Sequence, residues 1–210
     1  QRVTQNGIFL LAPTIFEFGT PEQKERFLPA MAAADDLWCQ GWSEPDAGSD
    51  LAGIKSRAAR DDERGGWVIN GQKTWTTRGA FCNWVFGLFR TDPEAARHSG
   101  MTYLMVPLDA SGVTVRGVER LDGDEGFAEV FFDDVRVPAA NLIGEENKGW
   151  TYAKVLLTHE RTNIADVNRA KRELERLKRI AKAEGVLDDM RFRDEIAKLE
   201  VDIIALEMMV

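Results

Sequence analysis

Long apolar runs are missing from this sequence, and so are the usual targeting signals. No stretch reaches the roughly 18 consecutive apolar residues of a transmembrane helix, and Gln1 to Gly7 lack the basic-then-apolar pattern of a secretory signal peptide. Cysteine is scarce, since Cys39 and Cys82 are the only two and neither lies in a CxxC pair. The sequence therefore predicts no membrane span, no metal site and no disulfide framework, and it favours reduced thiols in a cytoplasmic protein.

An excess of positive charge is also missing. The 27 Lys and Arg residues against 35 Asp and Glu residues leave a net charge of −8 at pH 7. Proteins that bind nucleic acid need a basic surface, because neutralisation of phosphates drives their binding. We therefore predict no nucleic-acid partner. The 44% apolar and 30% charged residues over 210 positions are typical of a globular chain with one or two cores.

The residue pattern divides the chain into three parts: residues 1–36 are helical, 37–138 contain strands, and 139–210 are helical again. In the first part, Thr20 suits a helix N-cap, Pro21 suits the first helical position, and Gln23 completes a capping box. The apolar stretch Ile8 to Phe18 before this helix predicts another, buried helix.

The middle part is rich in β-branched and aromatic residues, with turn signals between the runs. It predicts strands that include residues 84–90, 101–107, 113–121 and 127–133. Asn70-Gly71 lies between the runs Trp67 to Ile69 and Gln72 to Thr77, and predicts a two-residue hairpin turn there. Several short strands with few helical stretches indicate a small antiparallel barrel or sandwich.

The last part has helical periodicity, and Gly185 is expected to end its first helix. Apolar residues three or four apart form two stripes: Leu174, Leu177, Ile180 and Ala181, then Ile196, Leu199, Ile203 and Leu206. Because neither end of the chain carries a helix start or stop signal, we expect it to be incomplete at both ends. The predicted fold class is α+β: a helical N-terminal part, a central antiparallel β-barrel or sandwich, and part of a C-terminal helical bundle.

The stretch from Gln40 to Asp50 is the first that could carry chemistry. Its Pro, Gly, Ser and Asp residues follow an expected strand and form a loop that exposes hydroxyl and backbone N–H groups. Such loops bind phosphate oxygens. An ordinary polar turn is the alternative, and from these residue types alone it is the commoner outcome.

The second stretch runs from Lys73 to Thr77. Trp75 and Thr77 have the same parity on a strand, so both side chains are expected to face one way. An indole beside a hydroxyl donor can stack on a flat ring and hydrogen-bond its heteroatom. A core tryptophan with a threonine on the same face is the alternative.

The third stretch, Thr158 to Arg161, lies on a predicted helix. Glu160 is surrounded by apolar residues, so its carboxylate could serve as a general base. A solvated glutamate paired with a nearby cation is the alternative. Arg97 and His98, in a loop between strands, could contact phosphates, or that loop is simply solvated.

Five motifs in order resemble the acyl-CoA dehydrogenase family, and the resemblance runs over nearly the whole chain. The motifs are Phe18 to Lys24, Trp42 to Pro45 with Ala47 to Asp50, Asn70 to Thr77, Phe132 to Pro138 with Asn141 to Gly144, and Gly149-Trp150 with Glu160-Arg161. Two positions depart from the family pattern. Asp46 replaces what is often a glycine, and Arg78 stands where a small residue is common.

The resemblance implies an FAD cofactor bound by the middle part. The segment from Gln40 to Ser49, with Trp42 and Gly48 in it, would lie along the FAD. Ser43 would place its hydroxyl near the flavin ring, and Ser49 would lie near phosphate groups and the CoA substrate. Trp75 would pack against the isoalloxazine, and Thr77 would donate toward its N5 edge.

The resemblance also implies the reaction, which is α,β-dehydrogenation of an acyl-CoA thioester. Thr158 and Arg161 would lie near the substrate. In some members the glutamate that takes the α proton comes from this helix, immediately before the arginine, while the β hydrogen leaves as hydride to flavin N5. Glu160 stands at that position. In many other members the glutamate comes from the last helical domain.

The implied setting is lipid or fatty acid metabolism, with an electron-transfer flavoprotein as acceptor and a homo- or hetero-oligomeric tetramer, a dimer of dimers. Two alternatives stay open. One is an acyl-CoA oxidase or flavin monooxygenase of the same fold. The other is a non-catalytic or partner-dependent subunit of a mixed oligomer. The sequence leaves short-chain, branched, long-chain and steroid-derived thioesters equally open.

Overall fold

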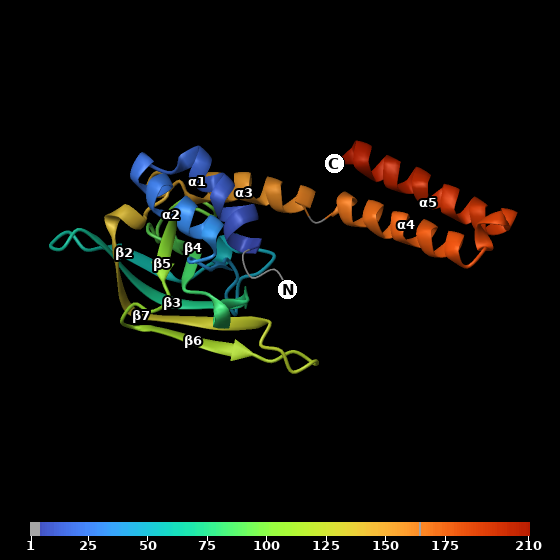
Figure 1. The fold of residues 1–210 in the computed structure, drawn as a ribbon. Helices are drawn as coiled ribbons and strands as arrows, with labels where there is room; N and C mark the ends of the chain where they lie inside the picture. The colour runs from blue at the N-terminus through green and yellow to red at the C-terminus, as the bar shows by residue number, and fades with distance from the viewer. Residues whose placement is uncertain (1–4, 164) are drawn as a thin grey trace. The chain divides into compact units, whose positions relative to one another are not determined.

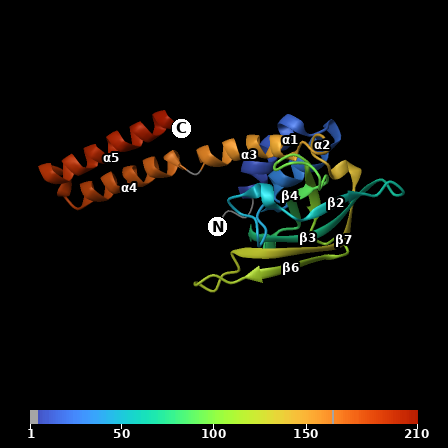
Figure 2. The same cartoon turned by 180° about the vertical axis from the view of Figure 1, so that it is seen from behind.

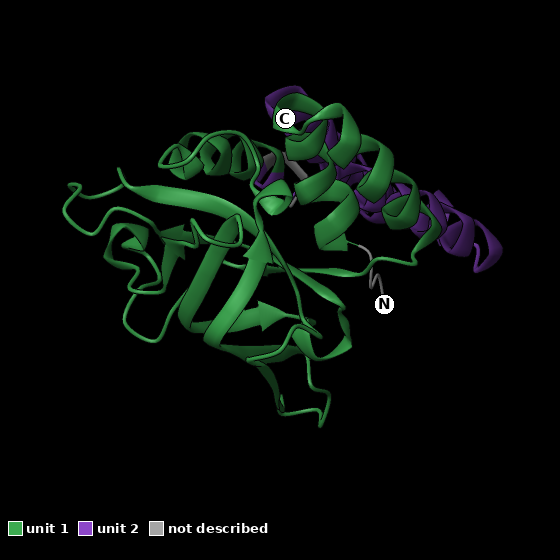
Figure 3. Ribbon diagram, turned by 90° about the vertical axis from the view of Figure 1, so that its left-hand side faces the viewer, with its two compact units in different colours: residues 1–159 green, residues 160–210 purple. Residues whose placement is uncertain are grey.

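A computed structural model describes residues 5–163 and 165–210 of the chain. It separates into two compact units, residues 1–159 and 160–210 (Figure 3). Gln1 to Thr4, the start of the stretch without a signal-peptide pattern, lie outside the described residues. Within the described ranges, no helix has both the length and the hydropathy needed to cross a membrane.

The first unit opens with a π-helical turn η1 (Gly7–Leu11), followed by helices α1 (Ala12–Phe18) and α2 (Pro21–Ala33). The predicted capping box at Thr20 is confirmed: the Thr20 hydroxyl accepts from the Gln23 amide at 3.2 Å, and the Thr20 amide donates to Gln23 Oε1 at 3.0 Å. The prediction that residues 8–18 are buried needs correction. Leu11 and Ile15 are buried, whereas Phe16 is 63% exposed, so this stretch is amphipathic.

Seven strands form one curled sheet, a half-barrel with helices α1 and α2 beside it (Figures 1 and 2). The order is β1-β4-β2-β3-β7-β6, with β5 paired to β4. Most neighbours are antiparallel as predicted, but β1 runs parallel to β4, and β2 meets β4 in parallel at one position. The strands are β1 (Trp38–Gly41), β2 (Arg57–Arg60), β3 (Gly66–Thr77), β4 (Trp84–Arg90), β5 (Met101–Pro107), β6 (Val113–Val118) and β7 (Phe127–Pro138).

The predicted hairpin turn at Asn70-Gly71 is wrong. Strand β3 continues through both residues, and the chain reverses instead at residues 61–65, between β2 and β3. The pairing of β3 with β7 shifts at Gly71, which has a φ of +143°. A Cβ atom on Gly71 would come within 2.6 Å of the Ser56 backbone. The glycine therefore serves a bulge and a close backbone approach rather than a turn.

Buried side chains form two clusters in the first unit. One lies between the helices and the sheet and includes Trp38 and Trp84, whose rings stack at 5.0 Å. The other lies among the strands and includes Trp67. All three tryptophans are buried in these cores. Short 3-10 turns at Leu51–Gly53 (η2) and Gly79–Phe81 (η3) lie between strands, and a third at Ala139–Asn141 (η4) follows the last strand, β7.

Helix α3 (Gly149–Asn163) follows the sheet, and its last residues begin the second unit. Helices α4 (Val167–Ala183) and α5 (Met190–Met209) form an antiparallel hairpin through the 3-10 turn η5 (Val186–Asp188), seen in Figure 1. Gly185, at φ +71°, ends α4 as predicted. The predicted apolar stripes are only partly covered within this unit: Leu174, Ala181 and Ile196 are buried, whereas Ile180 and Leu199 are exposed.

Candidate functional site

The loop after β1 presents the first group of predicted site residues. Gln40 lies on β1, and Trp42 packs edge-on against Phe86 and Tyr103. The backbone of Glu44 closes a tight turn with Ala47, through N–H···O bonds of 2.8 and 3.1 Å. Gly48 and Ser49 follow this turn and are exposed. Exposed amide and hydroxyl groups on a rigid turn are suited to bind phosphate oxygens.

Asp46, one of the two departures from the family pattern, lies in this turn. Its carboxylate accepts from the Lys55 ammonium at 2.8 Å, and both side chains are largely exposed. The hydrogen bond from Lys55 and its charge hold the pKa of Asp46 below its ordinary value. Asp46 has a negative φ, so an aspartate fits the turn without backbone strain.

The fold brings the first two predicted stretches together. The Thr74 amide on β3 donates to the Ser43 carbonyl at 2.9 Å. Next to this bond, the Lys73 ammonium reaches Glu44 Oε1 at 2.7 Å. Ser43 therefore lies beside the strand that carries Trp75 and Thr77, although about thirty positions separate them in the sequence.

Trp75 is the most unusual residue of this region. Its φ is +55°, which is uncommon for a bulky side chain, and 61% of its surface is exposed. The strand pairing is interrupted between Lys73 and Thr76, so Trp75 projects from the sheet. Thr77 is exposed as well, whereas Thr76 between them is fully buried, and the shared face of Trp75 and Thr77 stays a prediction. An exposed indole beside a hydroxyl fits a flat heteroaromatic ligand such as a flavin.

Arg78, the second departure, does not present a free charge. Its guanidinium binds the Asp124 carboxylate at 2.9 Å, and the side chain is 16% exposed. It also lies over the Phe81 ring, 5.1 Å from the ring centre. Asp124 in turn accepts from Arg120 at 2.8 Å. Arg78 therefore connects the β6–β7 loop to the end of β3 through this ion pair. It does not add an unpaired cation beside Trp75.

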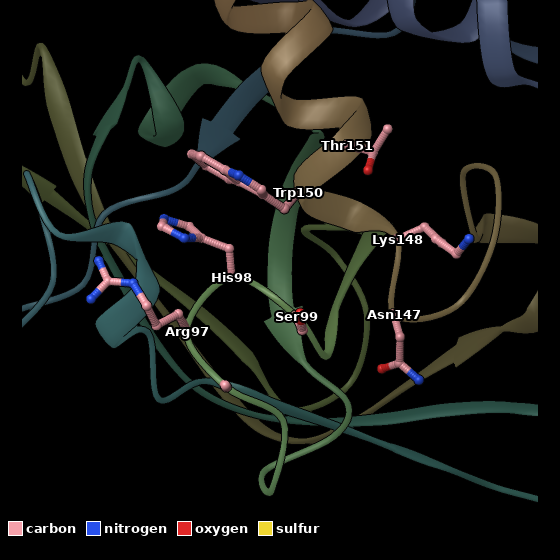
Figure 4. A pocket seen from close by; sticks show the side chains of 8 residues that line it. Arg97, His98, Ser99, Asn147, Lys148, Trp150 and Thr151 are labelled. Carbon is pink, nitrogen blue, oxygen red and sulfur yellow. The ribbon is translucent and has the colours of Figure 1, made fainter.

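A pocket of about 460 Å³ opens between the loop after β4 and the start of α3 (Figure 4). The His98 ring stacks on Trp150, with ring centres 4.2 Å apart and planes 26° from parallel. Arg90 holds the loop by donating to the carbonyls of Arg97 and Ser99 at 3.0 and 2.7 Å. The lining residues are Ala96, Arg97, His98, Ser99, Asn147, Lys148, Trp150 and Thr151.

Arg97 and His98 line this pocket together with Lys148. Their contact with phosphates stays a prediction. No local pattern indicates that Lys148 or Trp150 is a partner of this loop. They reach it because Met101 and Lys148 form a parallel bridge that draws the start of α3 to the edge of β5.

Thr158, Glu160 and Arg161 occupy the last turns of α3. Glu160 is half-buried and Arg161 is exposed. Thr158 belongs to the first unit and its hydroxyl donates to the Lys154 carbonyl at 3.0 Å, whereas Glu160 and Arg161 begin the second unit. The structure thus joins the predicted residues of the first two stretches, and the placement of Glu160 and Arg161 toward them stays a prediction.

A family model described as "Acyl-CoA dehydrogenase, middle domain" matches residues 39–135. The chain is 43% identical over 207 residues to acyl-CoA dehydrogenase IpdE1 of Mycolicibacterium smegmatis, covering 94% of this chain and 53% of the relative. It is 42% identical over 199 residues to IpdE1 of Mycobacterium tuberculosis, with 94% and 51% covered. The chain therefore spans about half the length of the curated relatives that it matches.

Three solved structures also superpose on this chain. A structure named "Tcur3481-Tcur3483 steroid ACAD G363A variant" superposes with a TM-score of 0.83 at 32% identity, over 96% of this chain and 53% of that one. The ChsE4-ChsE5 complex of Mycobacterium tuberculosis superposes with a TM-score of 0.78 at 34% identity, over 99% and 55%. Butyryl-CoA dehydrogenase of Megasphaera elsdenii superposes with a TM-score of 0.80 at 28% identity, over 94% and 54%.

Proposed function

The chain belongs to the acyl-CoA dehydrogenase family, and from that premise we propose that it forms the FAD-binding core of an enzyme that oxidises an acyl-CoA thioester at its α and β carbons. The observation that carries the proposal is the exposed Trp75, at a positive φ, on a strand bonded to the Ser43 loop. The division into helical residues 1–36, a middle domain 37–138 and helical residues 139–210 is part of the same proposal.

Each cofactor-binding residue has one role in this proposal. Trp75 packs on the flavin ring, while the hydroxyls of Thr77 and Ser43 bond to its edge. The loop that contains Gly48 and Ser49 binds phosphate oxygens through its exposed amides and hydroxyl. Gln40 and Trp42 support this loop from β1. When bound, FAD would supply the acceptor for the hydrogen that leaves the β carbon as hydride.

In this proposal, Glu160 removes the proton of the α carbon. The thioester carbonyl acidifies that proton, and a carboxylate within hydrogen-bond reach can remove it. Arg161 would pair with a negative group of the substrate, and Thr158 and Ser49 would contact its CoA part. Glu160 is half-buried, which suits a base that must be shielded from bulk water.

The pocket at His98 and Trp150 is suited to the nucleotide end of CoA. The stacked rings offer an aromatic surface for adenine, and Arg97 and Lys148 supply two cations for its phosphates. Both cations are exposed, so each phosphate contact is expected to contribute only about 0.2–1 kcal/mol. Their shared effect should appear in substrate binding rather than in the chemical step.

The proposed function is tested by mixing the intact, FAD-loaded protein with acyl-CoA thioesters without oxygen. The panel contains butyryl-, isovaleryl- and palmitoyl-CoA and the CoA thioester of a steroid side chain. We expect at least one thioester to bleach the visible flavin band, because reduction removes that absorbance. A protein that binds FAD but bleaches with none of these thioesters contradicts the dehydrogenase proposal.

The pocket gives a second prediction. The double variant Arg97→Ala with Lys148→Ala is expected to raise KM for the active acyl-CoA about tenfold and to leave kcat nearly unchanged, because two exposed phosphate contacts are lost in ground state and transition state alike. Steady-state kinetics with the acyl-CoA and with the corresponding acyl-pantetheine measure this effect.

Acyl-pantetheine lacks the nucleotide, so its KM should be the same for the double variant and the wild type. Lys154→Ala removes one exposed lysine of helix α3 that does not line the pocket, and its KM should match that of the wild type. If the double variant raised KM equally for acyl-CoA and acyl-pantetheine, the pocket would not bind the nucleotide.

A partner-dependent subunit is the second candidate function. Two similar structures are named for two components each, Tcur3481-Tcur3483 and ChsE4-ChsE5. Size measurement of the protein, alone and co-expressed with the product of a neighbouring paralogue, distinguishes a homotetramer from a mixed one. If the protein binds FAD and bleaches only as part of the mixed oligomer, the partner-dependent function is correct.

The electron acceptor and the compartment complete the proposal. We expect an electron-transfer flavoprotein to reoxidise the enzyme in the cytoplasm, where Cys39 and Cys82, which are free thiols in the structure, stay reduced. A same-fold oxidase is separated from a dehydrogenase by oxygen consumption during turnover. Rapid oxygen uptake without added acceptor would favour the oxidase.

A further inference from the structure

Lys73 is a fully buried cation that the proposed chemistry does not use. Its side chain has no exposed surface, and its ammonium donates to Glu44 Oε1 at 2.7 Å, to the Leu88 carbonyl at 2.7 Å and to the Trp42 carbonyl at 3.5 Å. Burial lowers the pKa of Lys73, and the Glu44 charge opposes that shift. Lysine is almost never buried so completely unless it is paired, so this position requires an explanation.

The Glu44 carboxylate accepts hydrogen bonds from several donors. Besides Lys73, its carboxylate accepts from the Lys55 amide at 2.6 Å and from the Ser56 amide at 3.1 and 3.2 Å. Its side chain is 5% exposed. These bonds connect three segments, namely the loop after β1, the two residues that precede β2, and strand β3. The pair is therefore a junction of the fold and not an isolated contact.

The junction lies between the residues proposed to contact the flavin. Glu44 follows Ser43 directly and opens the tight turn that leads to Gly48. Lys73 precedes Trp75 by two positions on β3, and the Thr74 amide between them bonds to the Ser43 carbonyl. Any shift of Lys73 relative to Glu44 would therefore move Trp75 relative to Ser43.

The backbone at Trp75 needs such a restraint. A tryptophan at φ +55° lies in a sparsely populated conformation, which persists only where its surroundings hold it. Lys73 is fixed on one side by its buried ammonium, and Thr76 on the other side donates its hydroxyl to the Ala128 carbonyl. With Lys73 released, the segment could relax toward regular strand geometry and turn the indole away.

We propose that the buried Lys73–Glu44 ion pair is a positioning device, which holds the Ser43 loop and the Trp75 segment in the register that the flavin requires. The inference rests on the proposed flavin site. It goes further by assigning a role to two residues that need not touch the cofactor. A pair kept only for folding could be replaced by neutral groups without loss, since buried ion pairs are often no better than well-packed apolar residues.

The test separates these two roles with Lys73→Met, Glu44→Gln and the double variant of the intact protein. Glutamine keeps an acceptor for the Lys55 and Ser56 amides, and methionine keeps the length of the lysine stem. We measure the dissociation constant of FAD from titration of the apoprotein, and the quenching of bound-flavin fluorescence, which reports stacking on an aromatic ring.

We expect the thermal stability of the double variant to return toward that of the wild type. Its FAD affinity should nevertheless be about 10- to 100-fold weaker, which is the size of effect seen when residues that orient a metal ligand are removed. Its bound flavin should also be less quenched. Val137→Ala, a buried change at the opposite end of β7 from Phe127, serves as the control. It should lower stability and leave the FAD dissociation constant unchanged.

Two results would overturn the inference. One is a double variant whose FAD affinity and quenching return to wild type together with its stability, because the pair would then serve folding alone. The other is a Val137→Ala variant that loses FAD affinity as strongly, because affinity would then simply follow stability. A wild-type protein that binds no FAD would instead contradict the proposed function itself, so the two failures are distinguishable.

Discussion

Replacement of Glu160 by glutamine is expected to slow flavin bleaching by the active acyl-CoA about 100- to 10,000-fold, the contribution typical of a general base. Glutamine has the same shape as glutamate but cannot take the α proton. Binding of FAD and of the thioester should persist, because neither depends on that proton transfer. Anaerobic stopped-flow absorbance measures the bleaching rate, and equilibrium titration measures the two affinities.

Glu173→Gln is a matched control for this change. Glu173 is an exposed glutamate on α4, in the same compact unit as Glu160, and its pairing with Arg176 at 3.6 Å is weak. This control should bleach at the wild-type rate. If Glu160→Gln does so too, the enzyme keeps its proposed activity but takes its base from another part of the protein.

Loss of one partner of the buried ion pair is expected to give the second large effect. Lys73→Met should lower the free energy of unfolding by about 3–5 kcal/mol, because it leaves the Glu44 carboxylate buried without its counter-ion. Urea unfolding followed by tryptophan fluorescence measures this loss. Lys55→Met breaks an ion pair to Asp46 whose side chains are 74% and 70% exposed, and should leave the free energy of unfolding nearly unchanged.

The same pair predicts how stability depends on pH. Burial raises the pKa of Glu44, but the Lys73 charge and the hydrogen bonds from Lys55, Lys73 and Ser56 outweigh it, so the pKa lies below its ordinary value of 4.5. A lowered pKa in the folded state contributes stability that is present above pH 4.5 and is lost as the pH falls through the lowered value. The stability gap between wild type and Glu44→Gln should therefore narrow in acid. A gap that stays constant down to acid unfolding would show that the Glu44 charge does not stabilise the fold.

Local signals predicted the elements that depend on neighbouring residues. The capping box at Thr20 and the helix end at Gly185 are found where the sequence predicts them. The strands expected at 84–90 and 101–107 are β4 and β5 with the same limits, because apolar runs bounded by turn residues form buried strands. By contrast, the strand expected at 113–121 ends at Val118.

Asn70-Gly71 shows where local reasoning fails. The pair is a strong hairpin signal, but the glycine is needed because Ser56, on a segment distant in sequence, lies against it. Lys73 is a similar case. A lysine in a strand of mixed polarity is normally a solvated residue, and only the assembled sheet encloses it with Glu44 and the Leu88 carbonyl.

The sequence by itself determined the family, the succession of helical, strand-containing and helical parts, and the residue types that a flavin and a thioester would require, because these are carried by short motifs and by periodicity. Only the tertiary structure decided which of these residues meet. The Thr74–Ser43 bond, the Lys73–Glu44 pair and the stack of His98 on Trp150 each join positions at least 29 apart in the chain. Such contacts depend on the closure of the sheet and on the burial of charge within it, which no local pattern encodes.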